Sequence, residues 1–237
     1  MKRKIYLWGG IVAVILAAAF FVYSKWMSAT KVAFVNYQII TLGEIHKAND
    51  NSFIKIATVD TEELDKLKGY DMVFINAMGL RITEEQRAQI QKAADEGLPV
   101  LSTAVTNPAN KIISIDSLQA DTLKQYLSNG GRHNYRSMLN YVRKYIDGKK
   151  FSLHEPEAVV ERANDMLYHA VPGKPDEEEL GFNSIAEYHA FLRKHGLLKE
   201  GAPRIIITGP MGQPADLIRR LEETGNVVPA GDRKSVV

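Results

Sequence analysis

The sequence predicts an α/β protein: an N-terminal transmembrane helix, a parallel-sheet α/β lobe, a helical insertion and the start of a second α/β lobe. Between residues 31 and 102, short apolar runs alternate with amphipathic stretches, as in strands and helices that alternate along a parallel sheet. An uncharged apolar run opens the chain, and consecutive helical patterns begin after residue 116. We expect a membrane segment over 1–28, an α/β lobe over 29–116, a helical insertion over 117–200 and the next lobe over 201–228.

Composition and charge exclude several functional classes. The 237 residues include 30 Lys and Arg against 28 Asp and Glu, which gives a net charge of +2. A nucleic-acid-binding protein would usually carry a basic excess on one face, so we expect no nucleic-acid partner. The chain contains no cysteine, which excludes a disulfide framework, a thiolate-bound metal and a cysteine nucleophile.

The opening segment predicts a membrane anchor. Residues 5–23 carry no charge and follow the basic residues 2–4, with Trp8 near the start of the run and Trp26 just after its end. About 20 apolar residues cross the hydrocarbon core as a helix, and the preceding cations favour a cytoplasmic N-terminus. We therefore expect a single-pass inner-membrane protein with its body in the periplasm. A cleaved signal peptide is the alternative.

The first α/β lobe follows from its apolar runs and turn residues. Thr83 with Gln86, and Asp60 with Glu63, have the spacing of capping boxes at helix starts. Gly97 has the place of a helix C-cap. The expected strands cover 31–40, 53–59, 72–75 and 100–102, and the expected helices cover 41–49, 61–67 and 83–96.

The sequence predicts mainly helices in the second half of the chain. Gly130 and Gly131 predict a turn between two of them. Ser184 and Glu187 predict a third capping box, for a helix that ends at His195. The expected helices cover 118–127, 135–146, 156–168, 184–195 and 215–224, with a loop over 171–180 and a strand over 204–208.

The last residues of the chain resemble a translated sequencing adapter. In one reading frame, residues 232–237 correspond to DNA that resembles an adapter used in short-read sequencing. We therefore expect residues 229–237 to be a non-native tail and the chain to be the front piece of a longer protein.

Candidate chemistry is sparse. Gly130 and Gly131, followed by Arg132 and His133, could form an anion-binding nest, or simply a helix–helix turn. The six histidines show no metal-ligand spacing, and His169 could cap the end of the expected helix over 156–168. Gly209 to Gly212 lack the Walker pair. The residues alone therefore assign no catalytic residue and no metal site.

Residues 118–169 resemble the CobN / magnesium-chelatase H family, the large subunits of cobalt and magnesium chelatases. The resemblance rests on a helix, a Gly-Gly turn, an Asn, and a helix rich in Leu and Tyr, followed later by a Tyr-His pair. The matching residues are Gly130, Gly131, Asn134, Leu139, Tyr141, Tyr168 and His169. Ala170 stands where the family pattern has Pro, and Met166-Leu167 stands where it has Gly-Ile.

The resemblance implies a tetrapyrrole-binding subunit that holds a corrinoid or haem-type macrocycle while cobalt, iron or magnesium is inserted or removed. With the predicted anchor, the chain is similar to HmuS-type homologues beside haem- and corrinoid-uptake systems. The implied partners are the membrane, the tetrapyrrole substrate, the remaining domains of the same polypeptide, and ATPase chelatase subunits or uptake-system proteins. His169, Gly130 and Gly131 are the candidate tetrapyrrole-binding residues. The alternative is a stand-alone membrane-tethered α/β module that binds a small ligand or serves as a scaffold.

Overall fold

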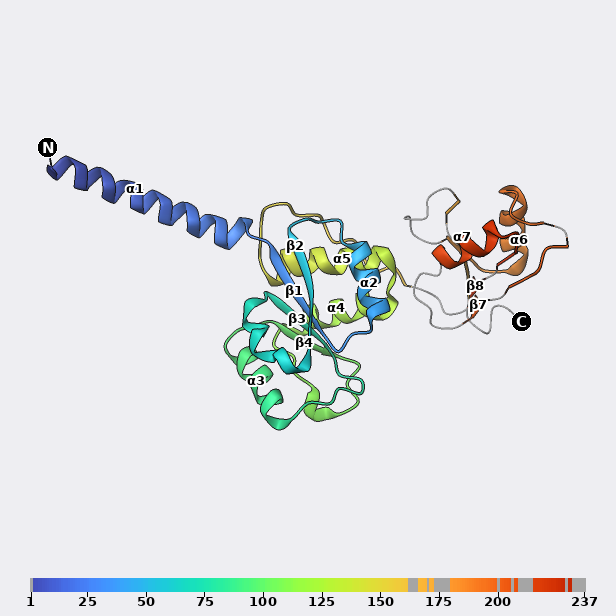
Figure 1. Cartoon of the computed structure of the whole chain (residues 1–237), viewed down its shortest axis with the longest axis horizontal. Coiled ribbons are helices and arrows are strands. Elements are labelled where there is room, and N and C mark those ends of the chain that lie inside the picture. The colour runs from blue at the N-terminus through green and yellow to red at the C-terminus, as the bar shows by residue number, and fades with distance from the viewer. Residues whose placement is uncertain are drawn as a thin grey trace.

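The computed structural model contains two regions, each with its own hydrophobic core (Figure 1). We call residues 30–161 the N-terminal lobe, and the described residues between 166 and 231 the C-terminal lobe. The structure describes residues 2–161, 166–169, 171–172, 180–199, 201–205, 207–208, 215–228 and 230–231.

A parallel four-stranded sheet forms the centre of the N-terminal lobe, with strand order β2-β1-β3-β4. The strands are β1 (Thr30–Val35), β2 (Ile54–Val59), β3 (Met72–Asn76) and β4 (Val100–Thr103). The predicted α/β class with a parallel sheet is confirmed. β1 ends well before the expected residue 40, because the chain enters the next helix at Ile39.

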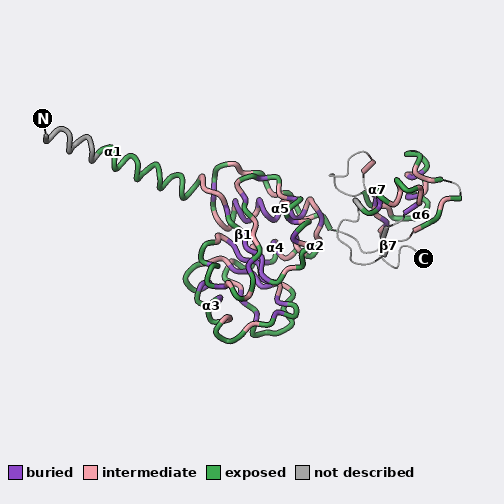
Figure 2. Tube along the Cα trace, in the orientation of Figure 1, coloured by how far each residue is buried: buried purple, intermediate pink, exposed green. Residues whose placement is uncertain are grey.

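Helices cover both faces of this sheet because successive strand residues point to opposite sides. Val32 and Phe34 of β1 belong to the core beneath α2, α4 and α5, whereas Ala33 and Val35 belong to the core beneath α3 and η2. Figure 2 shows these buried strands inside an exposed shell. The helices are α2 (Ile39–Ala48), the 3₁₀-helix η2 (Thr61–Gly69), α3 (Glu84–Asp95), the 3₁₀-helix η3 (Pro108–Asn110), α4 (Ser117–Asn129), α5 (Gly131–Tyr141) and the π-helical turn η4 (Val142–Ile146).

The expected capping boxes have different outcomes. At α3, the N–H of Gln86 donates to Oγ1 of Thr83 at 3.2 Å, and the N–H of Thr83 donates to Oε1 of Gln86 at 2.8 Å, so this box is confirmed. At η2 the prediction is wrong, because the Asp60 side chain makes no cap bond and Glu63 has non-helical torsions of −118° and 23°. The Glu63 carboxylate pairs with Lys66 instead.

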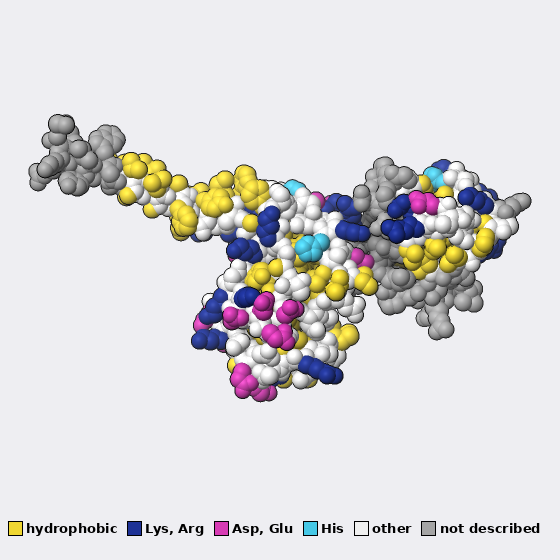
Figure 3. All heavy atoms as spheres, viewed as in Figure 1, with side chains coloured by type: hydrophobic (Ala, Val, Ile, Leu, Met, Phe, Trp, Pro, Cys, Tyr) yellow, Lys and Arg dark blue, Asp and Glu magenta, His cyan; other side chains and the backbone are white. Residues whose placement is uncertain are grey.

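The start of the chain requires a correction. Residues Lys2–Val22 form α1, whose side chains are described from Ile11 onward. The described apolar side chains of α1 are exposed, as Figure 3 shows. Crossing the hydrocarbon core takes about 20 apolar residues. Within the described part of the chain, no helix combines the length and apolarity that a membrane crossing requires. This finding overturns the predicted transmembrane helix and the inner-membrane localisation.

The helix expected over 156–168 is also absent from the described part of that range. Residues 156–161 form neither helix nor strand, residues 167–169 form strand β5 (Leu167–His169), and residues 162–165 lie outside the described residues. Side chains of the neighbouring helices bind main-chain groups of this segment. A local pattern could not reveal these partners.

The C-terminal lobe contains a small mixed sheet with strand order β6-β5-β8-β7. β7 and β8 are parallel, whereas β5 is antiparallel to both β6 and β8. Tyr188 and Leu192 of α6 pack against Leu167 and Val227. Besides β5, the elements are β6 (Leu180–Phe182), α6 (Ile185–Lys194), β7 (Ile207–Thr208), α7 (Ala215–Glu223) and β8 (Ala230–Gly231).

The sequence expectations for this lobe are met only in part. The N–H of Glu187 donates to Oγ of Ser184 at 3.2 Å, but the Glu187 carboxylate accepts from the N–H of Asn183, so only half of the expected box forms. Most of the loop expected over 171–180, the turn over 209–212 and residues 232–237 lie outside the described residues.

Candidate functional site

The Gly130–Gly131 turn joins α4 to α5 and needs its glycines. Gly130 has φ of 60° and Gly131 has φ of 81°, a region that residues with a Cβ seldom adopt. A Cβ on Gly130 would also lie 3.2 Å from the hydroxyl of Tyr135. The Asn134 side chain closes the turn by donating to the carbonyl of Gly130 at 2.7 Å.

The protein's own groups occupy much of the predicted anion nest at this turn. The N–H of Gly130 donates to the carbonyl of Tyr126 at 3.0 Å. Gly131 is buried, and His133 Nε2 lies 3.1 Å from the carbonyl oxygen of Ala158. The arrangement therefore fits a structural turn, and anion binding by Gly130 and Gly131 stays a prediction.

The structure places His169 inside the C-terminal lobe, at the end of β5. Its side chain is almost fully buried, and Nε2 lies 2.7 Å from Oε1 of Glu222 on α7. The imidazole packs against Phe191 and Tyr188, with ring centroids 5.1 and 5.8 Å apart. A direct contact between His169 and a macrocycle would therefore require this pair to open.

Tyr188 forms the polar end of the same cluster. Its hydroxyl donates to the carbonyl of Val228 at 2.6 Å, and burial raises the pKa of Tyr188 above its usual range. The described contacts of Tyr188 and His169 thus tie α6, α7 and the sheet together.

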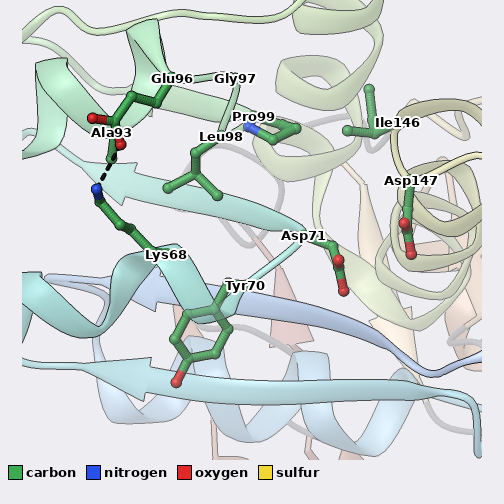
Figure 4. A pocket seen from close by; sticks show the side chains of 10 residues that line it. All are labelled: Lys68, Tyr70, Asp71, Ala93, Glu96, Gly97, Leu98, Pro99, Ile146 and Asp147. Carbon is green, nitrogen blue, oxygen red and sulfur yellow. Dashed lines mark hydrogen bonds and ion pairs between the residues drawn. The ribbon is translucent and has the colours of Figure 1, made fainter. Parts of the chain in front are cut away.

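A cavity of about 390 Å³ opens at the amino ends of β3 and β4 (Figure 4). Asp71 and Asp147 lie on one side of it, and Lys68 pairs with Glu96 at 2.5 Å on the other. Burial is the main cause that raises the pKa of the Asp147 carboxyl, while its hydrogen bond from Thr30 opposes that shift and Asp71 adds to it. The walls are formed by Lys68, Tyr70, Asp71, Ala93, Glu96, Gly97, Leu98, Pro99, Ile146 and Asp147.

The two aspartates of the cavity already bind other groups of the fold. Asp147 Oδ2 accepts from the Thr30 hydroxyl at 2.6 Å, and its other oxygen lies 3.5 Å from the Lys149 ammonium. Asp71 Oδ2 accepts from the N–H of Lys31 at 2.8 Å. Among the described residues, no cluster of three or more His, Asp or Glu side chains could hold a metal ion.

The carboxyl ends of β1, β3 and β4 form a second candidate region, the place where the alternative ligand-binding module would hold its ligand. Asn36 and Ala104 follow their strands with φ of 59° and 48°, and such outliers concentrate at functional sites. Tyr37 and Thr103 join two of the loops through hydroxyls 3.1 Å apart, and burial raises the pKa of Tyr37 to about 12. An Asn directly after a strand was the one local signal, because Asn adopts this conformation more readily than most residues.

The loops at this edge and the first turn of α2 carry exposed apolar side chains. Asn36 donates to the carbonyls of Asn76 and Met78 at 2.8 and 3.1 Å, which holds the loop after β3 beside the end of β1. In open α/β sheets, ligands bind outside the carboxyl ends of the strands where the strand order reverses, here between β1 and β3. The exposed apolar residues are Ile39, Ile40, Met78 and Val105.

Comparison with known proteins gives a weak and partial likeness. No family model matches the chain, and no curated protein matches it. Among solved structures, the chain is similar to the catalytic subunit of cobaltochelatase from Mycobacterium tuberculosis, at 15% sequence identity and a TM-score of 0.46. The match covers 85% of this chain but only 16% of that subunit. The likeness therefore gives a chelatase-like structural neighbour, without support for a specific metal, a membrane anchor or haem utilisation.

Proposed function

We propose that this chain is the N-terminal part of a tetrapyrrole-binding large subunit of a metal chelatase, similar to CobN. The observation that carries the proposal is the pattern of Gly130, Gly131 and Asn134, followed by Tyr168 and His169. The geometry supports it by giving the first three residues a common role, since Asn134 closes the glycine turn and also binds the main chain of Val160. The first three residues of the pattern thus belong to one structural unit, the turn between α4 and α5.

In this proposal, the macrocycle binds between this part and the remaining domains of the same polypeptide. The tetrapyrrole is a corrinoid or a haem-type ring, and cobalt, iron or magnesium is the ion inserted or removed. ATPase chelatase subunits or uptake-system proteins would be its partners. Metal exchange requires protons to move at the pyrrole nitrogens, so a histidine or a carboxylate is needed near the ring. His169, Gly130 and Gly131 are the candidates in this part of the protein.

The first test is to read the gene past the codon for Val228 in intact genomic DNA. A frame that continues for several times this length supports the proposal. A stop codon directly after Val237 contradicts it.

The second test compares the complete gene product with the present 237-residue chain. Absorbance titrations with protoporphyrin IX and with cobinamide should show binding by the complete protein and none by this chain. His169→Ala in the complete protein should weaken that binding, with Glu222→Gln as a control that alters the environment of the same imidazole. Unchanged affinity in His169→Ala would remove His169 from the site.

A second candidate function is a stand-alone ligand-binding module. The observation that favours it is the carboxyl edge of the sheet, where Asn36 and Ala104 have positive φ beside exposed apolar side chains. This module would be stable and would bind a small ligand as the present chain alone. Binding of protoporphyrin IX by this chain, abolished by Met78→Asp, would favour this function over the first.

A further inference from the structure

Residues 155–161, which we call the strap, form neither helix nor strand and bind to the α4–α5 hairpin before the chain leaves the N-terminal lobe. Side chains of the hairpin bind the strap through its main chain. The Tyr126 hydroxyl donates to the carbonyl of Glu157 at 2.5 Å, and Ser137 Oγ accepts from the N–H of Glu157 at 3.2 Å. His133 Nε2 lies 3.1 Å from the carbonyl oxygen of Ala158.

Asn134 makes the most specific contact with the strap. Its amide nitrogen donates to the carbonyl of Val160 at 2.8 Å, and its amide oxygen accepts from the N–H of Val160 at 3.0 Å. One side chain thus satisfies both polar groups of one residue, as a neighbouring strand would in a sheet. Asn134 is itself buried, so it cannot readily exchange these bonds for water.

The strap is acidic where the hairpin region is basic. Arg136 pairs with Glu157 at 2.8 Å, and Lys144 pairs with Glu155 at 2.5 Å. These pairs are exposed at one end, so each adds less than about 1 kcal/mol. They select the charge of the bound segment, while the buried main-chain bonds hold it.

The helical spacing explains why one face of α5 supplies these groups. His133 and Ser137 are one turn apart, and Asn134 lies beside them on the helix surface. The Gly130–Gly131 turn brings Tyr126 of α4 to the same face. The glycine turn therefore assembles the binding groups from two helices.

We propose that the α4–α5 hairpin is a recognition site for an acidic segment that offers its main-chain polar groups, and that the strap of the same chain is its occupant. Bound in this way, the strap fixes the point at which the chain departs for the C-terminal lobe. The inference does not depend on the chelatase proposal, because it uses only contacts within the N-terminal lobe.

The test is digestion of the full chain under native conditions with a protease that cleaves after glutamate. The peptide bond between Glu157 and Ala158 is the reporter, because it lies within the bound strap. Val160→Pro removes the N–H that donates to Asn134 but leaves the hairpin unchanged, whereas Val160→Ala keeps that N–H. We expect cleavage of the reporter bond to become about tenfold faster in Val160→Pro and to stay near the wild-type rate in Val160→Ala.

A second pair of variants tests the hairpin side. Ser137→Ala removes the acceptor for the N–H of Glu157, while Ser128→Ala removes a hydroxyl that donates to the carbonyl of Gln125 of its own helix at 3.1 Å. Cleavage should become several times faster in Ser137→Ala alone. An added peptide with the sequence of 155–161 should also speed cleavage, and the same peptide with lysines in place of Glu155 and Glu157 should not. Equal cleavage rates within both variant pairs, or equal effects of the two peptides, would overturn the proposal.

Discussion

Arg143 in the N-terminal lobe and His169 in the C-terminal lobe are both buried basic side chains, and their hydrogen-bond partners differ in kind. In the N-terminal lobe, Arg143 is fully buried and donates mainly to main-chain carbonyl groups. In the C-terminal lobe, His169 is also buried, and its Nε2 lies 2.7 Å from a carboxylate oxygen of Glu222. Arg143 thus binds main-chain carbonyl groups of several segments, whereas His169 contacts a charged side chain.

Arg143 links parts of the chain that are far apart in the sequence. Its guanidinium donates to the carbonyls of Ser28, Phe53 and Phe151 at distances of 2.6 to 3.3 Å. It also donates to the Thr30 hydroxyl at 2.9 Å, and that hydroxyl donates in turn to Asp147. Burial lowers the pKa of Arg143, and the nearby charges of Asp147 and Asp71 oppose this shift. The fork of the guanidinium, with its five donors, suits a site that gathers several carbonyl groups.

We expect the removal of the Arg143 guanidinium to lower the free energy of unfolding more than the other substitutions below. Arg143→Met should destabilise the N-terminal lobe by about 3–5 kcal/mol, because several buried carbonyl groups lose their donor together. Urea unfolding followed by circular dichroism measures this loss. Lys124→Met is the matched control, since Lys124 forms an exposed pair with Asp121 at 3.2 Å. A loss below about 1 kcal/mol for Arg143→Met would show that water replaces the guanidinium.

Glu222→Gln should have an intermediate effect that is confined to the C-terminal lobe. Gln keeps an acceptor for His169 but loses the carboxylate, so we expect a loss of about 1–2 kcal/mol. Amide hydrogen exchange should show faster opening in β5 and α7 and unchanged protection in β1 and β3. Glu223→Gln, at an exposed carboxylate paired with Arg219 at 2.6 Å, serves as the control. Equal effects of the two variants would contradict the role of the buried pair.

Asp147→Asn should have the smallest effect on stability, and this effect should be seen in how stability depends on pH. Burial raises the pKa of its carboxyl in the folded protein, so the folded state binds the proton more tightly than the unfolded state. The contribution of this group to stability is therefore largest at acidic pH and falls as pH rises from the unfolded pKa through the raised folded pKa. Asp147→Asn should flatten this part of the profile, measured as the urea midpoint between pH 4 and pH 7. If the urea midpoint of Asp147→Asn changes with pH as steeply as that of the wild-type protein, other groups cause the pH dependence.

The local prediction succeeded where neighbours in sequence determine the structure. The Thr83 capping box and the apolar run of β3 formed as expected, because their partners lie within a few residues. The predicted helix over 156–168 failed for the opposite reason: the partners of the strap are Tyr126, Asn134 and Ser137, 20 to 31 positions away. The sequence indicates His169 as a candidate through the adjacent Tyr168, whereas its contact Glu222 lies 53 positions further along the chain.

The sequence by itself determined the alternation of strands and helices, the parallel sheet and the glycine turn between α4 and α5. These features follow from local periodicity and from the conformational freedom of Gly130 and Gly131. Only the tertiary structure decided that Asn134 binds Val160, that Glu222 contacts His169 and that Arg143 binds the carbonyls of two distant segments, at Ser28 and Phe53. A buried polar group must find a partner wherever packing brings one, and packing brings together residues whose distance along the chain carries no periodic signal.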